Sequence, residues 1–225
     1  VRRPARANGD VDVAVDVTRN IMKYYSGGAG MVISSPGDVI TDLVQKESGL
    51  PAGRVFGTGT VLDSARFRYF LSVRLGADIR NVHGFTAGEH GESQFAVWSS
   101  VHLSGMRLDS FCAKRGILLD KEEVMKDTVS SGAQVIKRKG VTNYAIAAIA
   151  AELAGTVVKN KRSIFSVTSV LHDYYGINDV AVSVPSFVGD EGVVGNLVYD
   201  FTDEEAEKLR GSAAQLRSFL NSLHI

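Results

Sequence analysis

Three side chains that could together transfer a proton and hold an anion lie within residues 62–93. His90 stands in the segment "AGEHGES", where a glycine-rich turn would hold the imidazole yet leave it accessible, as a general acid or base requires. Asp63 and Arg66 are three residues apart and share one face of an expected helix. A carboxylate beside an imidazole fixes its tautomer and stabilises the protonated ring. A guanidinium can hold a substrate carboxylate through two parallel hydrogen bonds.

The spacing of these residues also has a simpler interpretation. Asp63 and Arg66 on one helical face can form an ordinary surface ion pair, which contributes less than about 1 kcal/mol. A single histidine in a turn, such as His90, needs no function. Spacing alone favours the surface pair and does not bring His90 to Asp63. The elements that position these side chains therefore decide between the two interpretations.

The overall composition argues against several classes of protein. The 225 residues contain 44% hydrophobic and 22% charged side chains, which is ordinary globular usage. Equal numbers of basic and acidic residues, 25 each, argue against a nucleic-acid or anionic-membrane partner. No apolar run approaches the ~20 residues that span a bilayer, and no apolar segment follows the N-terminal arginines as in a secretory signal. The single Cys112 fits a reducing compartment, so we expect a soluble cytoplasmic protein.

The N-terminal part of the chain predicts a small parallel sheet. The strict alternation of "DVDVAVDV" predicts a strand, whereas the segment from Val17 to Tyr25 fits a helix. Beyond them the sequence predicts a buried strand over Ala29–Ile33, a helix from Asp38 that ends at Gly49, and a strand over Arg54–Phe56. A strand–helix–strand connection is typical of parallel pairing. This part therefore indicates a piece of parallel α/β sheet.

The rest of the chain, from a boundary near residue 58, predicts a larger mixed α+β region. Helices are expected over residues 61–76, 121–139 and 143–158, and the last is apolar on nearly all sides, which predicts a buried central helix. Short strands with glycine-rich turns are expected between the first two helices, and an antiparallel meander over residues 163–200. Thr202 and Glu205 form a capping box, which predicts a final helix with an apolar stripe of Leu209, Ala213, Leu216, Leu220 and Leu223.

Several segments taken together resemble the L-lactate dehydrogenase family in its bacterial form. They are "ISSPGDVI", "GTGTVLDSARFRYFL", "NVHGFTAGEHGESQFAVWS", "KGVTNYAIA" and "YYGINDVAVSVPSFVGDEGV", and they cover nearly the whole chain. The related malate dehydrogenases share a looser form of the pattern. The resemblance implies an NAD-dependent oxidoreductase of glycolysis and fermentation, a cytoplasmic homotetramer that reduces pyruvate to L-lactate with NADH.

The resemblance also implies a fold class and a division into domains. Residues 1–57 would be the remnant of an NAD-binding Rossmann domain, the C-terminal part of its parallel sheet. Residues 58–225 would be a mixed α+β catalytic domain with an antiparallel meander. The family begins with a glycine-rich turn that seats the cofactor pyrophosphate, and this sequence contains no G-x-G-x-x-G. The N-terminal part of the Rossmann domain is therefore expected to be lacking, and the family has a helix where "DVDVAVDV" predicts a strand.

The roles of individual side chains are implied by the same resemblance. His90 would exchange a proton with the C2 oxygen of the substrate, Asp63 would orient His90, and Arg66 would hold the substrate carboxylate. The remaining positions are Thr142, Ser35 and Asp38 at the substrate, and Ile33, Ser34, Ser35, Thr58 and Ile146 at NAD; no metal is implied. Hydride transfer to a keto carbon builds negative charge on its oxygen, so a cationic imidazole there stabilises the transition state.

Regulation is a further implication of the resemblance. In allosteric bacterial members, the positions that match Arg68 and His83 bind fructose 1,6-bisphosphate across a subunit interface. Two cationic side chains suit a phosphate group, so these two residues are the expected allosteric site.

Two positions depart from the family pattern. Ser35 stands where the family has asparagine, and a serine hydroxyl cannot offer the two donors of an amide. Weaker activity is expected on this ground. The family's mobile active-site loop, which carries an arginine at the substrate carbonyl, is shortened near "VRRPARANGD". Arg6 is a candidate for that arginine, and Arg2 is similar to a cation of the malate enzymes.

Two alternative functions stay open at this point. Within the same class, the substrate would be malate or another L-2-hydroxy acid, although the apolar residues near "QFAVWS" favour a monocarboxylate. In a different class, the chain would be a catalytically incomplete fragment that acts as a binding or assembly protein, because it lacks the glycine-rich turn.

Overall fold

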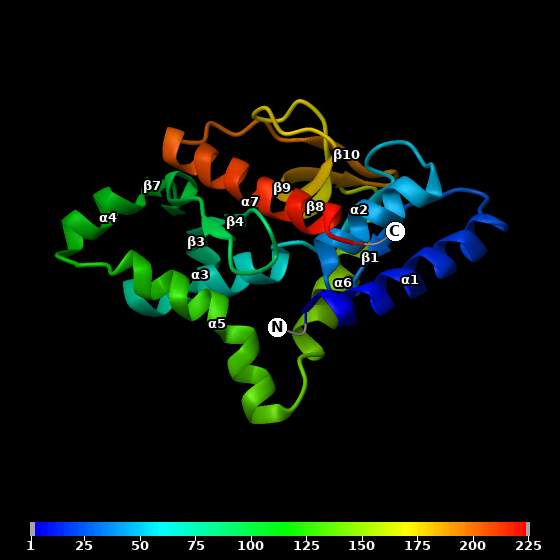
Figure 1. Ribbon diagram of the computed structural model, residues 1–225. Helices are drawn as coiled ribbons and strands as arrows, with labels where there is room; N and C mark the ends of the chain where they lie inside the picture. Colours follow the sequence, from blue (N-terminus) through cyan, green and yellow to red (C-terminus); the bar gives the residue numbers. More distant parts are fainter. Residues whose placement is uncertain (1–2, 224–225) are drawn as a thin grey trace.

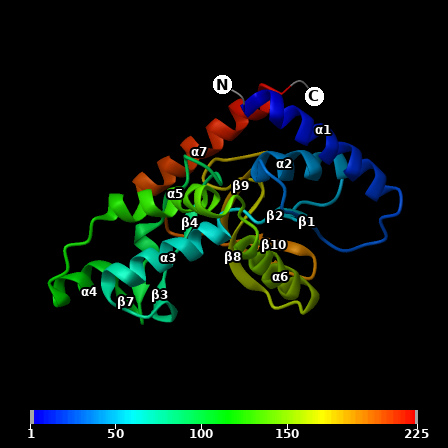
Figure 2. The same ribbon diagram turned by 90° about the horizontal axis from the view of Figure 1, so that it is seen from below.

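The computed structural model describes residues 3–223 (Figure 1), and for residues 3–8 it describes the backbone alone. Arg2 and the side chain of Arg6 therefore lie outside the described residues. The described chain forms one five-stranded mixed sheet, two smaller sheets and seven α-helices. Helices α2 and α7 lie on one side of the large sheet and α6 on the other (Figure 2).

The large sheet has the strand order β1-β2-β8-β9-β10. Its strands are β1 (Gly30–Val32), β2 (Val55–Gly57), β8 (Ser163–Leu171), β9 (Val180–Gly189) and β10 (Gly192–Asn196). β1 and β2 are parallel and joined by α2 (Gly37–Ser48), which confirms the predicted strand–helix–strand unit. β8, β9 and β10 are antiparallel, which confirms the meander. Gly57 of β2 pairs with Thr168 of β8, so the parallel and antiparallel parts share one sheet.

The first strand differs from the prediction of a buried strand. Gly30, Met31 and Val32 are only half-buried. β1 is the edge of the described sheet and pairs with β2 alone within residues 3–223, so one side of its backbone has no neighbouring strand.

The alternating segment near the N-terminus is helical, and the prediction of a strand there is wrong. Helix α1 (Arg3–Met22) includes all of "DVDVAVDV". Val11 is buried and Val15 packs against the same cluster, whereas Val13 and Val17 are 63% and 50% exposed. Burial thus recurs every fourth residue, as in a helix. As a strand, this segment would place all four valines on one face. As a helix packed against α2, it covers Val11 and Val15 and leaves Val13 and Val17 exposed.

A second hydrophobic cluster surrounds α3 (Val61–Leu75). This helix ends at Gly76 as predicted, and the glycine has a φ of 59°. Phe67, Leu71 and Leu75 of this helix are almost fully buried. The elements that follow α3 are short up to α4, and α5 is a long helix. They are η1 (Ile79–Asn81), β3 (Val82–His83), β4 (Thr86–Ala87), β5 (Phe95–Ala96), η2 (Trp98–Ser100), β6 (His102–Leu103), β7 (Met106–Arg107), α4 (Leu108–Arg115) and α5 (Lys121–Lys139). This part contains the helix and the loop that carry the residues of chemical interest.

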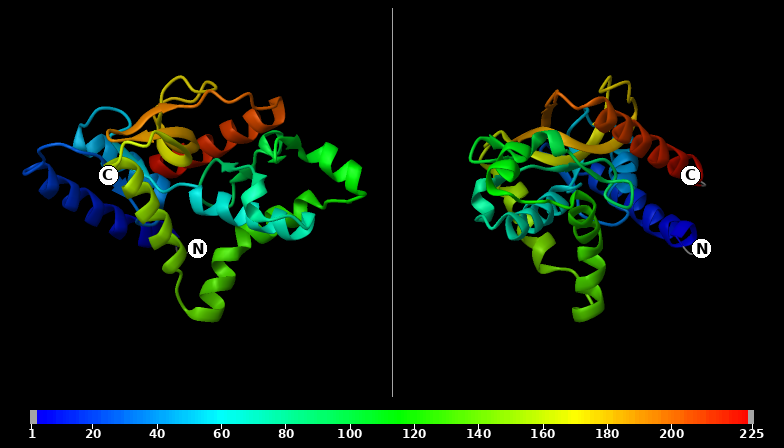
Figure 3. Two further views of the ribbon diagram at one scale, coloured as in Figure 1. Left: turned by 180° about the vertical axis from the view of Figure 1, so that it is seen from behind. Right: turned by 90° about the vertical axis from the view of Figure 1, so that its left-hand side faces the viewer.

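Helix α6 (Tyr144–Val158) lies where a helix was predicted, but it is not a buried central helix. Ile149, Leu153 and Thr156 are buried, whereas Tyr144 and Val158 are 76% and 83% exposed. α6 contacts β9 and α3 with one face only. Its other face consists mainly of alanines, so the uniform hydrophobicity of the sequence did not distinguish the covered side from the open one. α5 and α6 form a hairpin that projects from the body of the molecule (Figure 3).

The final helix α7 (Asp203–Asn221) confirms the predicted capping box. Thr202 accepts a hydrogen bond from the Glu205 backbone, and the Glu205 carboxylate accepts one from the Thr202 backbone. The buried residues of the predicted stripe are Leu209, Ala213, Leu216 and Leu223, and Leu220 is partly buried. No helix among the described residues has both the length and the apolar character needed to cross a bilayer.

Candidate active site

The loop that carries His90 lies between β4 and β5 and is bonded to two other elements. The Gly88 N–H donates to the Ser183 carbonyl of β9 at 2.9 Å, and the Ser183 N–H donates back at 3.2 Å. The Glu89 N–H donates to the Ser212 hydroxyl of α7 at 2.6 Å. Residues that are distant in the sequence therefore hold the loop in place.

The imidazole of His90 contacts Asp63, in the first turn of α3. Nδ1 of His90 lies 2.5 Å from Oδ2 of Asp63. Asp63 is 2% exposed, whereas the His90 side chain is 44% exposed. The hydrogen bond to Asp63 raises the pKa of His90, with partial burial of the ring acting in the opposite direction. Because Nδ1 faces the carboxylate, Nε2 is the nitrogen left to meet an external partner.

Arg66 contacts the other oxygen of the same carboxylate. Its Nη1 lies 3.3 Å from Oδ1 of Asp63, and its side chain is only 16% exposed. Helix α5 passes beside the guanidinium, since a methyl group placed on Gly132 would lie 3.6 Å from Nη1. The interpretation as a surface ion pair is therefore wrong. Asp63 is a buried carboxylate shared by a histidine and an arginine, so a side chain able to exchange a proton lies beside one able to bind an anion.

Asp38, in the first turn of α2, contacts His90 through the backbone. Its Oδ2 accepts from the His90 N–H at 2.6 Å, and its Oδ1 accepts from the hydroxyl of Thr168. Asp38 is 4% exposed, and burial raises its pKa to about 6, although both hydrogen bonds favour the charged form. Its two oxygens thus face groups of the protein.

Sequence reasoning missed the hydroxyls that surround this carboxylate. Thr168, Ser183 and Ser212 are all buried and hydrogen-bonded near the His90 loop. A signal existed in the strand "SIFSVTSVL", where three small hydroxyl residues, Ser166, Thr168 and Ser169, lie next to valines inside a buried run. Buried hydroxyls need partners, so this pattern indicates a polar network within the sheet.

The residues expected at NAD lie mainly at the carboxyl ends of β1 and β2. Ile33 and Ser34 follow β1, and Thr58 follows β2, its N–H donating to the Val32 carbonyl at 3.1 Å. Ile33 is 47% exposed, and Ser34 and Ser35 are also exposed. In open α/β sheets, ligands bind at the carboxyl ends of parallel strands. These positions are therefore accessible at the edge where a dinucleotide would be expected.

Thr142 and Ile146 lie farther along the chain, at the start of α6. Thr142 is in the turn between α5 and α6, and Ile146 is in the first turns of α6; both are half-buried. Within residues 9–223, no hydrogen bond joins Thr142 to His90, Asp63 or Arg66.

The two residues expected to bind fructose 1,6-bisphosphate lie close to each other. Nη1 of Arg68 donates to the carbonyl of Gly84 at 3.2 Å, and Gly84 directly follows His83. His83 is exposed in β3. Burial lowers the pKa of Arg68, and the Glu152 carboxylate of α6 opposes this effect.

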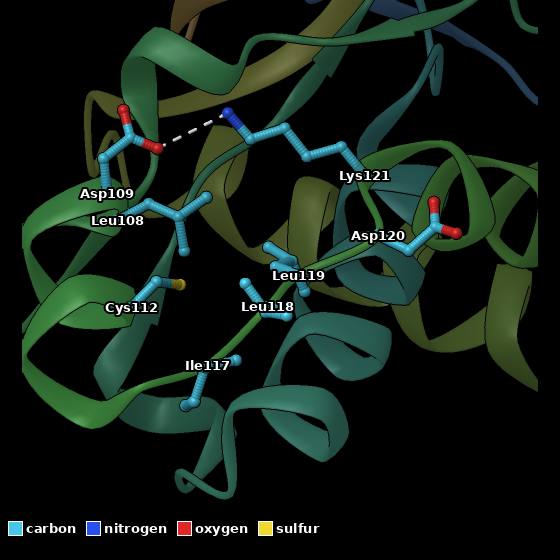
Figure 4. Close-up of a pocket in the computed structure, with 8 residues that line it drawn as sticks. All are labelled: Leu108, Asp109, Cys112, Ile117, Leu118, Leu119, Asp120 and Lys121. Atoms are coloured by element: carbon cyan, nitrogen blue, oxygen red, sulfur yellow. Dashed lines mark hydrogen bonds and ion pairs between the residues drawn. The ribbon is translucent and has the colours of Figure 1, made fainter.

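A separate hollow of about 540 Å³ lies between α4 and the start of α5 (Figure 4). It is lined by Leu108, Asp109, Cys112, Ile117, Leu118, Leu119, Asp120 and Lys121. Its polar feature is a 3.5 Å contact between the Lys121 ammonium and the Asp109 carboxylate. None of the residues expected at the substrate, at NAD or at the allosteric site lines it. Among the described residues, no group of at least three His, Cys, Asp or Glu side chains could hold a metal ion.

Comparison with known proteins identifies the family of this chain. Residues 60–224 match the lactate/malate dehydrogenase, alpha/beta C-terminal domain. The chain belongs to this family. The L-lactate dehydrogenase of Thermoanaerobacterium saccharolyticum is 39% identical over 208 residues, which are 91% of this chain and 67% of that protein. The L-lactate dehydrogenase A chain of Ambystoma mexicanum is 38% identical over 219 residues, 96% of this chain and 66% of that protein.

A solved L-lactate dehydrogenase from Clostridium thermocellum has a similar fold. Its TM-score is 0.92 at 45% sequence identity, covering 100% of this chain and 75% of that chain. This similarity confirms the predicted fold class. It also confirms that the chain resembles the L-lactate dehydrogenases. This chain spans about two thirds of the length of the curated relatives, 67% in the first case.

Proposed function

We propose that this protein is an NAD-dependent L-lactate dehydrogenase that reduces pyruvate to L-lactate and catalyses the reverse reaction. The observation that carries the proposal is the buried Asp63 carboxylate, with Nδ1 of His90 at 2.5 Å on one oxygen and Nη1 of Arg66 at 3.3 Å on the other. This arrangement supplies one proton donor and one carboxylate binder within a single site. The names of the similar proteins, which are L-lactate dehydrogenases, support the same reaction.

His90 is the proposed acid–base residue. NADH, when bound, would supply the hydride that reaches the keto carbon of pyruvate. As negative charge develops on the keto oxygen, the Nε2–H of protonated His90 donates its proton to that oxygen. Asp63 keeps Nδ1 protonated and stabilises the positive ring. In the reverse direction, neutral His90 accepts the proton of the lactate hydroxyl.

Arg66 is the proposed binder of the pyruvate carboxylate. Its side chain is 16% exposed, so a second anion would meet it in a partly desolvated site where charge interactions are stronger than in water. Its contact with Asp63 restricts the orientation of the planar fork, which suits bidentate binding. We place Thr142 and Ser35 beside the same substrate, and Asp38 behind His90 because both of its oxygens face protein groups.

The residues at the sheet edge fit the nicotinamide end of NAD. Ile33 offers an exposed apolar side chain and Ser34, Ser35 and Thr58 offer hydroxyls where two parallel strands end. Ile146 would pack at the same ring. The printed sequence has no glycine-rich turn for the pyrophosphate, so the fit of these residues concerns the nicotinamide end alone.

We propose a domain boundary at residue 58, with residues 1–57 belonging to the dinucleotide-binding domain and residues 58–225 to the catalytic domain. The parallel β1–α2–β2 unit ends at Gly57. The match to the C-terminal domain of the family begins at residue 60. Both observations support a division at this point, although the two parts contribute strands to one sheet.

We also propose a homotetramer that acts in the cytoplasm, in glycolysis and fermentation, and is activated by fructose 1,6-bisphosphate at Arg68 and His83. The adjacency of Arg68 to Gly84 supports a shared phosphate site. The open face of α6, with Tyr144 76% exposed and Val158 83% exposed, supports further burial by another subunit.

A direct assay tests the proposed reaction. NADH absorbance is followed with pyruvate and, separately, with oxaloacetate, each in the presence and absence of fructose 1,6-bisphosphate. We expect turnover with pyruvate well above that with oxaloacetate, and an increase with the bisphosphate. Turnover with oxaloacetate alone would contradict the substrate assignment. No turnover in a folded protein that binds NADH would contradict the function.

A further inference from the structure

We propose that Asp38 is a positioning residue that fixes the backbone of His90 through a closed ring of hydrogen bonds. The inference rests on the proposed acid–base role of His90. Asp38 accepts from the His90 N–H at 2.6 Å with one oxygen and from the Thr168 hydroxyl with the other. A carboxylate has two acceptor oxygens and so suits these two donors.

The hydrogen bonds continue from Thr168 until they return to the His90 loop. Oγ1 of Thr168 lies 2.7 Å from Oγ of Ser183, directly opposite it in the β8–β9 pair. The backbone of Ser183 exchanges two hydrogen bonds with Gly88, which lies two residues before His90. Asp38, Thr168 and Ser183 are at most 4% exposed. Water therefore has little access to the ring, and each bond gains strength from the low local dielectric.

His90 is consequently held at two atoms by two helices. Its backbone N–H is bonded to Asp38 of α2, and its Nδ1 to Asp63 of α3 at 2.5 Å. The two helices pack in different hydrophobic clusters, with Val39 of α2 in one and Phe67 of α3 in the other. Loss of the Asp38 contact would remove one of these two attachments of His90, although Gly88 and Glu89 would still hold the loop to β9 and α7. The His90 ring would then be free to shift about its bond to Asp63.

Helix α2 contains a matched control at Asp42, one turn after Asp38. Asp42 is 0% exposed and also accepts a backbone N–H, that of Ala181, at 3.0 Å. It pairs with the Lys46 ammonium at 2.5 Å. Asp38 forms no ion pair with a lysine or arginine among the described side chains. Its donors are a hydroxyl and the His90 backbone, so the two carboxylates share burial and helix but only Asp38 contacts the reacting residue.

Three variants test the inference: Asp38→Asn, Asp38→Ala and Asp42→Ala. An asparagine can accept from the His90 N–H and donate to Thr168, whose hydroxyl then donates to Ser183. We therefore expect Asp38→Asn to keep the kcat for pyruvate within about threefold. Asp38→Ala should lower kcat by about 100-fold with little change in KM. Asp42→Ala should lower thermal stability and leave the kcat of the folded protein unchanged.

A second measurement needs neither substrate nor cofactor. The proton shared by His90 and Asp63 should give a low-field NMR resonance, assigned by its loss in His90→Asn. We expect it to persist in Asp38→Asn and Asp42→Ala, and to shift or vanish in Asp38→Ala. Should Asp38→Ala fail to fold, Thr168→Val takes its place, because valine keeps the shape of threonine and removes its hydroxyl.

The outcomes separate this inference from the proposed function. An unchanged resonance and kcat in Asp38→Ala, or in Thr168→Val where it takes its place, would overturn the positioning role. An Asp38→Asn variant as impaired as Asp38→Ala would also overturn it, because charge rather than placement would then matter. Turnover that survives in His90→Asn would instead refute the proposed function. The low-field resonance, compared between the wild type and the Asp38 variants, would still test the positioning role of Asp38.

Discussion

The His90 site and the hollow beside Cys112 are assembled in different ways. The His90 site unites side chains from a loop, from α3 and from α2, and its central carboxylate, Asp63, is 2% exposed. The hollow is lined by eight residues that lie between positions 108 and 121 of the sequence, and the two charged atoms of its ion pair are 3.5 Å apart (Figure 4). Concave shape alone therefore does not mark the candidate active site of this molecule. The convergence of charged groups from separate elements is what distinguishes it.

The largest effect in this comparison is expected from His90→Asn. Asparagine cannot donate a proton as imidazolium does, so kcat should fall by about 10³-fold or more. Binding of NADH, measured by fluorescence titration, should change little because the variant keeps the fold. Loss of both turnover and NADH binding would indicate misfolding instead.

Asp63→Asn should have the next largest effect. The Asp63 carboxylate raises the pKa of His90 in the folded protein. The contact between protonated His90 and Asp63 therefore stabilises the fold fully below the ordinary histidine pKa, and this stabilisation is lost as pH rises through the higher pKa of the folded state. Removing the charge should lower the pKa of His90, measured by NMR titration of the ring. Pyruvate reduction should then decline at lower pH than in the wild type, with kcat reduced on the order of 10²-fold.

An unshifted titration of His90 in Asp63→Asn would contradict the electrostatic role of Asp63. Asp42→Asn is the matched control for this variant, because it removes another buried charge that does not contact the imidazole.

Arg66→Lys should give a smaller effect, seen mainly in KM. Lysine keeps the positive charge but loses the planar fork that binds a carboxylate by two hydrogen bonds. We expect the KM for pyruvate to rise roughly 10-fold to 100-fold, measured by steady-state kinetics. Arg74→Lys is a suitable control, since Arg74 is also on α3 but pairs with Asp127 at 2.6 Å. Equal KM values for Arg66→Lys and the wild type would remove Arg66 from the substrate site.

The smallest effects are expected from variants in the hollow beside Cys112. Cys112→Ser and Leu118→Ser alter the hollow at a half-buried and a fully exposed position. Both should leave kcat/KM for pyruvate within about twofold of the wild type. A loss comparable to that of Arg66→Lys would show that the hollow takes part in the reaction and would break the distinction drawn above.

The sequence predicted elements well where local chemistry determines them. Gly49 and Gly76 end α2 and α3 in left-handed conformations, and Thr202 with Glu205 starts α7. Prediction from the sequence failed where packing between elements decides the secondary structure or which face is buried. The alternating valines of α1 fit a strand until the cluster that contains Val11 is known. The alanine-rich face of α6 lacks a signal that separates the covered side from the open side.

The candidate site shows the same limit. The types and spacing of Asp63 and Arg66 indicated an ion pair, and the family resemblance indicated that His90 would join them. Their convergence depends on the hydrogen bonds that hold the His90 loop to β9 and α7, which span more than ninety residues in each case. Spacing could not have shown that Asp38 faces the His90 backbone and Thr168, because those contacts form only when α2, β8 and the loop meet.

The end of β2 limits how this site could be redesigned. A methyl group on Gly57 would lie 2.4 Å from the Thr41 hydroxyl, and one on Gly59 would lie 2.5 Å from the Ser183 hydroxyl, with Gly59 at φ +51°. Saturation libraries that randomise these two codons would return almost nothing but glycine. Attempts to evolve a new substrate range should spare them and diversify the solvent-facing Ser34 and Ser35.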